Sequence, residues 1–523
     1  SMTTPCSNYG YAVTTLNAQR IPDRVALSYR GQQFSYSELN TRVNITANAL
    51  LTLGIQPGSR VGVLIHDALP IAECYLALAK IGATIVALNP YWSDEIMLAM
   101  LKHCKVDAAL TQTADRDRIA TLRVALPESI IWLQLEADNL PANTSSLSAA
   151  KGLNNDAEPI TTRGGDDPLA YFFTSGTTGL PKAVVHTHNS CSSMADIWLA
   201  LPRDEDSVWG TGTIIWGVGF PCTIGAALSV GMRVALEDDF GPKGLLDAIQ
   251  REPISHFCVI PSFWSDLLAN HDHQAIDLSS ISVVLLGGEP LATNLLNKIK
   301  ERIPDAALYA FYGQTEAPYT CFGRLDDGSQ AANVAGLARP GCAAQVLDGN
   351  GNSVTEYIGE LAVTGAHCMQ GYFGQAEKTA QDMRGGWFFS GDIATQDKEG
   401  RITVLGRRED TIQRAGHYIQ PLDIEDAAIG VSGITEAGVV GIDVGGEGPA
   451  ILLAVTTDNS IGETDIIEQL QRSLPAHAVP DRVVITDELP HSNDNSGGKG
   501  KLLRARIHAQ YAHLLAPQTN AEN

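Results

Sequence analysis

The sequence has little positive charge. Its 36 lysines and arginines are outnumbered by 59 aspartates and glutamates, which leaves a net charge of −23 at pH 7. A surface with this balance repels phosphate backbones, so it excludes nucleic acid as a general partner. An anionic small molecule would need a local site built from backbone amides, hydroxyl groups and one or two cations.

Closely spaced cysteines are also absent. The chain has nine cysteines but no Cys-x-x-Cys pair, and the nearest two, Cys321 and Cys342, are 21 positions apart. This spacing excludes a zinc knuckle and a compact disulfide scaffold, and it indicates a reducing compartment. The first residues lack a basic stretch followed by an apolar one, so we expect no signal peptide and a cytoplasmic protein.

The sequence has few candidates for a membrane span or a serine nucleophile. The segment from Val208 to Met232 carries no charge, but it contains six glycines and Pro221. This composition is typical of a buried strand, loop and helix rather than of a bilayer span. The Gly-x-Ser-x-Gly elbow is missing, which excludes a serine hydrolase of that kind.

The pattern of apolar residues predicts α/β layers. With 523 residues, the chain is too long for a single core, so we expect two or more domains. After Gly406 the pattern changes to a shorter unit, which predicts domains over residues 1–406 and 407–523. Helices are expected over 37–53 and 69–81, with strands over 60–65, 83–88, 169–173, 183–186, 283–286 and 308–311.

The densest functional signal is the loop from Thr174 to Lys182, TSGTTGLPK, between two predicted strands. Its hydroxyls, glycines and lysine suit the oxygens of a phosphate group. It is not the helix-opening P-loop, because GxxxxGK[ST] is absent and a strand follows. By composition alone, the segment could equally be a turn rich in serine and threonine.

The order of residues in this loop closely resembles the signature loop of the adenylate-forming superfamily. That superfamily contains acyl- and aryl-CoA synthetases, peptide-synthetase adenylation domains and luciferases. Its further motifs are matched in order by Gly287–Pro290, Phe311–Glu316, Trp387–Asp392, Gly406–Asp410 and Gly416–Glu425. Each segment taken singly could be a turn or a solvated charge pair, but the ordered set spans most of the chain.

The resemblance implies a fold and a nucleotide site. We expect a large N-terminal domain of layered sheets and helices, and a small mobile C-terminal α+β domain. In the family, the glutamate that ends the motif matched by Phe311–Glu316 holds Mg²⁺. The aspartate that ends the motif matched by Trp387–Asp392 accepts hydrogen bonds from ribose. The implied ATP- and AMP-binding residues are Thr174, Ser175, Gly176, Thr177, Thr178, Gly179, Lys182, Gly288, Glu289, Pro290, Tyr312, Gly313, Gln314, Thr315, Asp392 and Arg407.

The resemblance also implies catalytic and moving parts. Lys182 and Glu316 would act on the phosphates, with Glu316 as the Mg²⁺ ligand and Thr178 as a second candidate ligand. The family's final motif, G-K-x-x-R, is matched by Gly500–Arg504, so Lys501 is the expected catalytic lysine. The loop before it is longer than usual and contains a competitor, Lys499. Glu409 occupies the hinge position, and Gly416 would line the tunnel for the thiol.

The acid substrate is expected between the phosphate loop and Glu316. No aspartate lies in the segment around Trp216, whereas relatives that activate amino acids place one nearby, so a neutral aryl or short acyl acid is favoured. The segment is similar to benzoate- and anthranilate-type CoA ligases, although plain core is the commoner fate of such aromatics. His186 and His188 are expected to share one face of a strand. The predicted pocket residues are His186, His188, Ile215, Trp216, Gly217, Phe220, Gly313 and Tyr319.

The resemblance therefore implies an AMP-forming acid–thiol ligase. It would use ATP and Mg²⁺ to convert a carboxylic acid to acyl-AMP and would then transfer the acyl group to CoA. The alternative acceptor is the phosphopantetheine of a separate carrier protein, and a homodimer is left open. A catalytically inactive scaffold is disfavoured by the presence of Lys182, Glu316 and Asp392.

Overall fold

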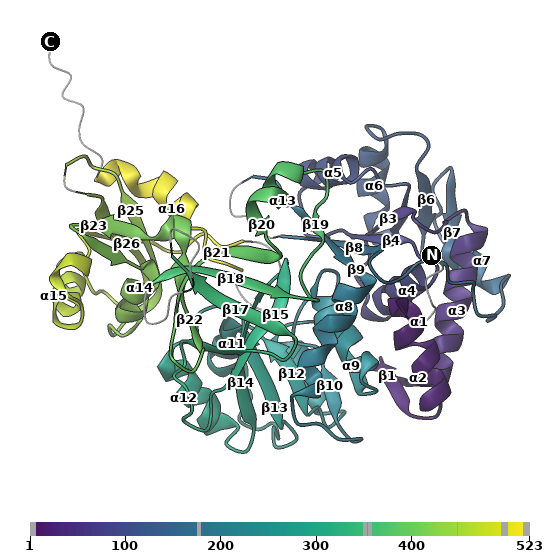
Figure 1. The fold of residues 1–523 in the computed structure, drawn as a ribbon, viewed down its shortest axis with the longest axis horizontal. Coiled ribbons are helices and arrows are strands. Elements are labelled where there is room, and N and C mark those ends of the chain that lie inside the picture. The colour runs from purple at the N-terminus through teal and green to yellow at the C-terminus, as the bar shows by residue number, and fades with distance from the viewer. Residues whose placement is uncertain are drawn as a thin grey trace, which may run out of the picture.

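The computed structural model describes residues 7–174, 179–348, 353, 358–446, 448–492 and 500–515. It consists of a large N-terminal part with two extended sheets and a small C-terminal unit with its own sheet (Figure 1). This arrangement confirms the expected mixed α/β architecture. Ser175–Thr178 and Lys499, which carry some of the predicted functions, lie outside the described residues.

The first sheet has the strand order β19-β9-β8-β4-β3-β5-β6-β7 and is parallel from β8 to β7. β8 and β9 form an antiparallel pair in which Phe173 faces Ala183, so the loop between them leaves the carboxyl end of β8. Parallel sheets bind ligands at that edge. The bounds are Arg60–Val63 (β3), Thr84–Ala87 (β4), Ala108–Thr111 (β5), Ile131–Gln134 (β6), Thr144–Ser146 (β7), Pro168–Phe173 (β8), Ala183–Thr187 (β9) and Gly371–Tyr372 (β19).

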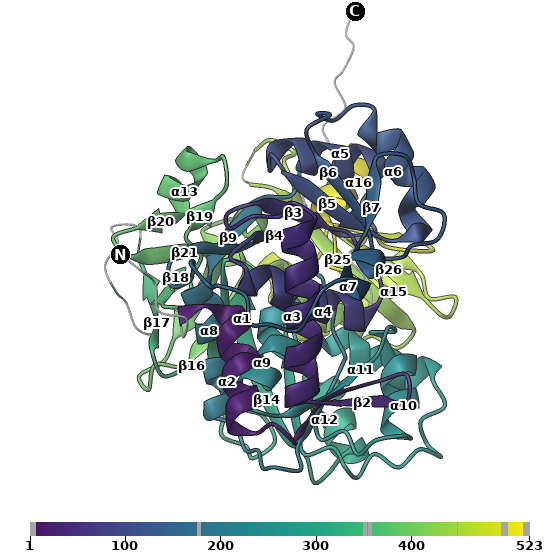
Figure 2. The same ribbon diagram turned by 90° about the vertical axis from the view of Figure 1, so that its right-hand side faces the viewer.

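Helices cover both faces of this sheet. A capping box between Ser35 and Glu38 begins α3, which runs beside α4 (Figure 2). α4 is buried along nearly its whole length. The bounds are Tyr9–Val13 (α1), Thr15–Arg20 (α2), Tyr36–Thr52 (α3), Ala68–Lys80 (α4), Asp94–His103 (α5), Arg116–Arg123 (α6), Leu147–Gly152 (α7) and His188–Met194 (α8).

The second sheet is longer and mixed. Its parallel part, from β1 through β11, β10, β12 and β13 to β14, continues into antiparallel strands. The bounds are Val25–Tyr29 (β1), Gln32–Ser35 (β2), Val208–Gly210 (β10), Arg233–Leu236 (β11), His256–Val259 (β12), Val283–Gly287 (β13), Ala307–Gln314 (β14), Ala317–Arg324 (β15), Val334–Ala338 (β16), Cys342–Leu347 (β17), Gly359–Gly365 (β18), Met383–Arg384 (β20), Trp387–Gln396 (β21) and Ile402–Arg407 (β22). Its helices are Gly225–Ser229 (α9), Pro242–Ile249 (α10), Pro261–Asn270 (α11), Thr293–Arg302 (α12) and Ala376–Asp382 (α13).

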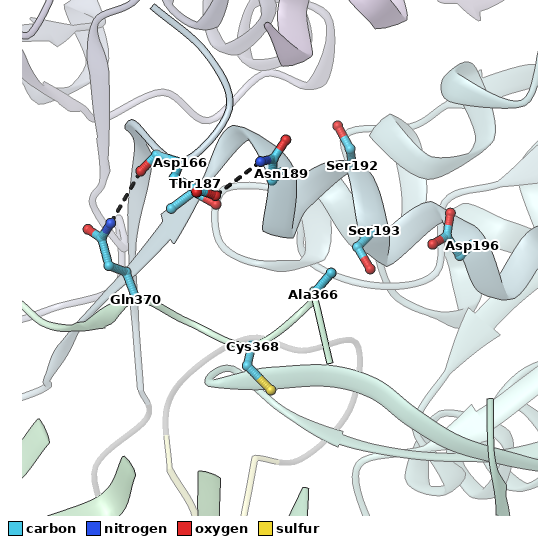
Figure 3. A pocket seen from close by; sticks show the side chains of 9 residues that line it. All are labelled: Asp166, Thr187, Asn189, Ser192, Ser193, Asp196, Ala366, Cys368 and Gln370. Carbon is cyan, nitrogen blue, oxygen red and sulfur yellow. Dashed lines mark hydrogen bonds between the residues drawn. The ribbon is translucent and has the colours of Figure 1, made fainter. Parts of the chain in front are cut away.

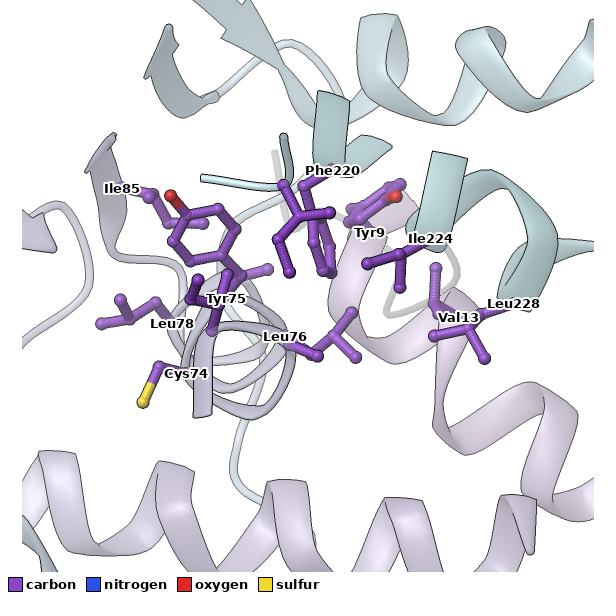
Figure 4. Packing of buried hydrophobic residues seen from close by; sticks show 14 of the residues in the cluster. Tyr9, Val13, Cys74, Tyr75, Leu76, Leu78, Ile85, Phe220, Ile224 and Leu228 are labelled. Carbon is purple, nitrogen blue, oxygen red and sulfur yellow. The ribbon is translucent and has the colours of Figure 1, made fainter. Parts of the chain in front are cut away.

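The segment from Val208 to Met232 forms β10, a loop, a π-helical turn and α9, as its glycines indicate. No helix among the described residues is long and apolar enough to cross a membrane. Phe220 from this segment packs edge-on against Tyr75 of α4, and Tyr9 and Val13 of α1 complete the layer (Figure 4). The core thus holds the loop before Phe220 against the first sheet.

The C-terminal unit has a core of its own. β25, β26 and β27 form its sheet, and apolar side chains from α14 and α15 pack on it. The bounds are Ile412–Arg414 (β23), His417–Ile419 (β24), Pro421–Ile429 (α14), Ile434–Ile442 (β25), Ala450–Thr457 (β26), Glu463–Ser473 (α15), Arg482–Ile485 (β27) and Arg504–Tyr511 (α16). The domain boundary after residue 406 stays a prediction.

Candidate active site

The phosphate-type loop is closed at its base by two hydrogen bonds. The Thr174 amide donates to the Lys182 carbonyl at 3.2 Å, and the Lys182 amide donates to the Thr174 hydroxyl at 3.2 Å. These bonds continue the β8–β9 ladder, so the register of these two buried strands determines the position of the Lys182 backbone. Ser175, Gly176, Thr177 and Thr178 lie outside the described residues, and their expected phosphate contacts stay predictions.

Glu316 lies in the tight turn between β14 and β15. The turn requires glycine at position 313, because a Cβ atom there would lie 2.4 Å from the Tyr319 nitrogen. The Glu316 side chain is buried, and its Oε2 accepts a hydrogen bond from the Tyr372 hydroxyl at 2.8 Å. The Lys182 ammonium lies 5.5 Å from the centre of the same tyrosine ring. Tyr372 therefore links the two predicted catalytic groups.

The arrangement of Glu316 fits a divalent cation. Its Oε2 is held by Tyr372, whereas its Oε1 has no hydrogen bond within the described part of the chain. A carboxylate oxygen is a ligand that Mg²⁺ prefers. Glu316 would hold the cation through this oxygen.

Asp392 is the centre of a polar network on β21. Its Oδ2 accepts hydrogen bonds from the Tyr312 hydroxyl and, at 2.9 Å, from the Gln314 amide. Its Oδ1 accepts one from Arg407 at 3.0 Å, because β21 and β22 place Asp392 and Arg407 opposite each other. Gly391 allows this approach, since a Cβ atom there would lie 2.6 Å from Arg407 Nη2. The structure thus brings together four predicted nucleotide residues.

The predicted adenine segment follows β13 at the carboxyl end of the strand. Gly288 has a φ of 84°, a conformation that favours glycine. The Glu289 carboxylate accepts a hydrogen bond from the Ser262 amide at 2.9 Å, at the start of α11. Pro290 is exposed beside it. β13 is the parallel neighbour of β14, so this turn and the Tyr312–Glu316 segment leave adjacent strands.

Several residues that are predicted to line the acid pocket are buried aromatic side chains. Trp216 contacts the ring of Tyr91 at 5.7 Å and that of Phe240 at 5.5 Å, measured between centroids. Its carbonyl accepts a hydrogen bond from the Tyr75 hydroxyl, which fixes the backbone of the loop. The Tyr319 hydroxyl donates to the Cys222 carbonyl at 3.0 Å. Ile215 is also buried, and a Cβ atom at Gly217 would meet nothing within 4 Å.

The expectation that His186 and His188 share a face of one strand is wrong. β9 ends at Thr187, whose side chain caps α8, so His188 begins the helix instead. His186 Nε2 donates to the Thr315 carbonyl at 2.7 Å, and His188 Nδ1 accepts from the Tyr9 amide at 2.9 Å. Both rings are fully buried. Through these bonds, His186 supports the turn that carries Glu316, and His188 supports the start of α1. A role for either histidine in the pocket wall stays a prediction.

The C-terminal motif ends in a buried ion pair. Arg504 donates from Nε and Nη2 to the carboxylate of Glu425, with Nη2 to Oε2 at 2.9 Å, and its Nη1 lies 3.5 Å from Asp410. Lys501, three residues earlier, is exposed. The Ser492 amide donates to the Lys501 carbonyl at 2.8 Å, and the Lys501 amide donates to the Ser492 hydroxyl at 2.8 Å. These bonds close the base of the long loop that precedes Lys501.

The hinge and tunnel positions lie nearby. Glu409 is exposed and accepts a hydrogen bond from Arg407 Nε at 3.3 Å. Gly416 has a φ of 77° in the turn between β23 and β24, and a Cβ atom there would meet nothing within 4 Å. The structure leaves space beside Gly416, and the tunnel itself stays a prediction.

Comparison with known proteins decides the family. The model of the AMP-binding enzyme family matches residues 15–373, and the model of the AMP-binding enzyme C-terminal domain matches residues 423–496. The chain belongs to the AMP-binding enzyme family. The expected membership of the adenylate-forming superfamily is therefore confirmed.

Relatives of this AMP-binding enzyme include several CoA ligases. The medium-chain fatty-acid–CoA ligase of Escherichia coli is 28% identical over 91% of this chain and 86% of its own. The feruloyl-CoA synthase of an Amycolatopsis species is 28% identical over 94% of this chain and 97% of its own. The fold matches that of ATP-bound MatB from Rhodopseudomonas palustris, with a TM-score of 0.87 at 24% identity over 97% of this chain and 99% of that one.

Two residues of this enzyme are not identified from the sequence. Tyr372 contacts Glu316 and Lys182, and Tyr75 fixes the Trp216 backbone. The sequence identifies Arg504 as the last residue of its motif but does not predict its pairing with Glu425. Tyr372 and Tyr75 reach the site through contacts between distant segments, which sequence spacing does not show.

A larger cavity lies apart from these residues. It has a volume of about 600 Å³ and lies between α8 with the 3₁₀ turn after it and the connection from β18 to β19 (Figure 3). Asp166, Thr187, Asp196 and Cys368 are among its lining residues, and none of the matched motifs contributes a described residue to it. We assign it no part in the chemistry.

Buried histidines predict a loss of stability in acid. Burial lowers the pKa of His188 to about 4 and that of His367 to about 3, whereas an unfolded histidine titrates near 6.5. Because the unfolded state binds more protons below pH 6.5, stability is complete above that pH and falls as the pH decreases toward 4. We expect each histidine to cost about 2 kcal/mol at pH 5 relative to pH 7.5.

Urea denaturation at both pH values measures this loss. His188→Gln keeps an acceptor for the Tyr9 amide and removes the titration, so the fall between pH 7.5 and pH 5 should be smaller by about 2 kcal/mol. An unchanged fall in the variant would show that His188 does not contribute to it.

Proposed function

We propose that the enzyme activates a carboxylic acid with ATP and transfers the acyl group to the thiol of CoA. The observation that carries this proposal is the convergence of Lys182, Tyr372 and Glu316 beside the network around Asp392. One cluster suits the phosphates and the other suits the ribose. The names of the CoA-ligase relatives support the same reaction.

In the first half-reaction, a substrate carboxylate oxygen attacks the α-phosphorus of ATP, and pyrophosphate leaves. Two anions must approach each other, so positive charge has to be placed at the point of attack. Lys182 would bind the outer phosphates, and Lys501 would bridge the carboxylate and the α-phosphate. Bound Mg²⁺ supplies further charge neutralisation on the phosphates. Glu316 would hold that ion, with Tyr372 holding Glu316.

In the second half-reaction, the thiol loses its proton to solvent and its sulfur attacks the acyl carbonyl carbon. A C–S bond forms, the bond between that carbon and the bridging oxygen breaks, and AMP leaves with this electron pair while its P–O bond stays intact. Asp392 and Arg407 would hold the ribose through both steps. The proposed pivot is Glu409, and the proposed domains are residues 1–406 and 407–523. Rotation of the small domain would bring Gly416 to the thiol path.

The acid is proposed to be neutral and aryl or short acyl. Trp216, Phe220 and Tyr319 are almost entirely buried, and the cavity next to Phe220, among Tyr75 and Phe172, has a volume of only about 10 Å³. A cavity of that size holds no more than one water. This cavity therefore offers no room for an acyl group beyond Phe220, and none of the described residues that line it is charged and could pair with a second carboxylate or an ammonium.

Pyrophosphate release over a panel of aryl, short-chain, long-chain and amino acids tests the proposal, with and without CoA. Acid-dependent release that CoA accelerates supports it and names the acid class. Release without acceleration, with acyl-AMP retained, would favour a carrier-protein acceptor. Silence with every acid would contradict the activity. A cytoplasmic setting is part of the proposal, supported by free thiols at all cysteines of the described ranges.

Trp216→Ala should widen the acid preference. The Tyr75 hydroxyl bonds the backbone of residue 216, so the loop keeps its course when the indole is removed. We expect kcat/KM for an acid one ring larger to rise about tenfold relative to the native acid. Trp264→Phe, in a separate buried cluster, is the control. An unchanged profile in Trp216→Ala would make Trp216 part of the core only.

A further inference from the structure

Tyr372 has an unusual set of neighbours. Its side chain is buried, and its hydroxyl lies 2.8 Å from Glu316 Oε2 and 3.0 Å from Asp382 Oδ2. Glu316 comes from the β14–β15 turn, whereas Asp382 is the last residue of α13. Two carboxylates from distant parts of the chain thus contact one phenol.

A phenol carries a single proton, so the two contacts are alternatives. The hydroxyl donates to Glu316 or to Asp382, and the carboxylate that it does not serve is left facing an oxygen lone pair. The choice between them depends on what else each carboxylate can bind. A buried carboxylate without a donor costs considerably more than an exposed one.

Asp382 has a donor of its own. The Lys378 ammonium lies 3.1 Å from Asp382 Oδ1, one helical turn away on α13. The Glu316 carboxylate has no hydrogen-bond donor other than Tyr372 among the residues that the structure describes. The ion pair therefore leaves the proton of Tyr372 to Glu316.

We propose that Tyr372 is a positioning residue for Glu316 and that Lys378, by satisfying Asp382, directs the tyrosine proton to it. The proposal deepens the proposed function, since Glu316 is the residue that would hold the divalent cation. With Oε2 held, Oε1 is kept in one orientation for that cation. Partners of this kind typically change metal affinity 10- to 100-fold when removed.

The test measures binding of Mn²⁺ with α,β-methylene-ATP by electron paramagnetic resonance, so it requires no turnover. Tyr372→Phe keeps the ring beneath Lys182 and removes only the hydroxyl. We expect it to weaken Mn²⁺ binding about tenfold. Circular dichroism and thermal unfolding would show that the variant folds.

Lys378→Met provides the decisive arm. It removes the ammonium donor of Asp382, so the Tyr372 hydroxyl donates to Asp382 instead of to Glu316. We therefore expect Mn²⁺ binding to weaken about threefold. Adding Asp382→Asn removes the competing charge and should restore binding to the wild-type value. In the Tyr372→Phe background, Lys378→Met should have no further effect. Glu377→Gln, an exposed charge change on the same helix, is the control.

A merely structural role for α13 would not produce the rescue by Asp382→Asn. Wild-type Mn²⁺ binding in Tyr372→Phe would overturn the proposal, as would equal losses in Lys378→Met and the double variant. Failure of the proposed function would look different, because the wild-type enzyme would then release no pyrophosphate with any acid.

Discussion

Lys501→Ala should lower acyl-AMP formation by about 10²- to 10³-fold, the cost of removing one preorganised charge from a developing anion. Lys501 is exposed, and its backbone rather than its side chain closes the preceding loop, so the fold should be unaffected. Acid-dependent ATP–pyrophosphate exchange measures the loss. Thioester formation from synthetic acyl-AMP and CoA should fall less than about tenfold, because no phosphate is attacked in that step.

Lys499→Ala is the matched control, since it removes the same charge two residues earlier. Lys499 lies outside the described residues, and its expected effect on exchange is less than about threefold. The reverse result would transfer the catalytic role to Lys499. Equal losses in both variants would show that the loop contributes through its charge rather than through one positioned lysine.

Arg504→Met should destabilise the C-terminal unit by about 3 kcal/mol, because it leaves Glu425 buried without its partner. Glu425 is among the most buried carboxylates of the unit, and Arg504 bonds both of its oxygens. Burial raises the pKa of Glu425 to about 7, with Arg504 opposing that shift. Without Arg504, folding favours the protonated carboxyl, so the variant should be less stable at pH 8 than at pH 6.

Hydrogen exchange of the segments over residues 423–473 measures this stability separately from that of the N-terminal part. Arg504→Lys keeps the charge but loses the second donor, so its effect should be intermediate. Glu425→Gln in the Arg504→Met background removes the uncompensated charge and should recover part of the loss. Wild-type exchange in Arg504→Met would show that the pair contributes nothing to stability.

The sequence predicted those parts of the site that are local in the chain. The strands on both sides of the Thr174–Lys182 loop follow from short apolar runs, and the Phe311–Glu316 segment is identified by a motif with fixed spacing. The Asp392–Arg407 contact depends on the register of β21 and β22, which no spacing in the sequence reveals. The prediction for His188 is wrong because the Thr187 side chain caps α8. The strand, in which side chains alternate between two faces, therefore ends before His188.

Tyr372 illustrates what could not be predicted. Its role requires β19 to pair with β9, which brings Tyr372 opposite Val184, two residues after Lys182. Asp382 and Lys378 lie on α13, a short helix with no buried residue. Such a helix has no apolar pattern from which its position against Tyr372 could be predicted. Long-range pairing, rather than local propensity, created this part of the site.

Arg407 forms hydrogen bonds with both Asp392, which is proposed to bind ribose, and Glu409, which is proposed as the pivot. Its Nη1 donates to Asp392 and to the Ser390 carbonyl, while its Nε donates to Glu409. A nucleotide whose ribose binds Asp392 would therefore change the hydrogen bonds of Arg407, including the one to Glu409, where rotation of the small domain would begin. Thermodynamic linkage makes the influence mutual: whatever factor the domain orientation contributes to nucleotide affinity, the nucleotide contributes to the orientation. Release of AMP and return of the small domain would then be one coupled event.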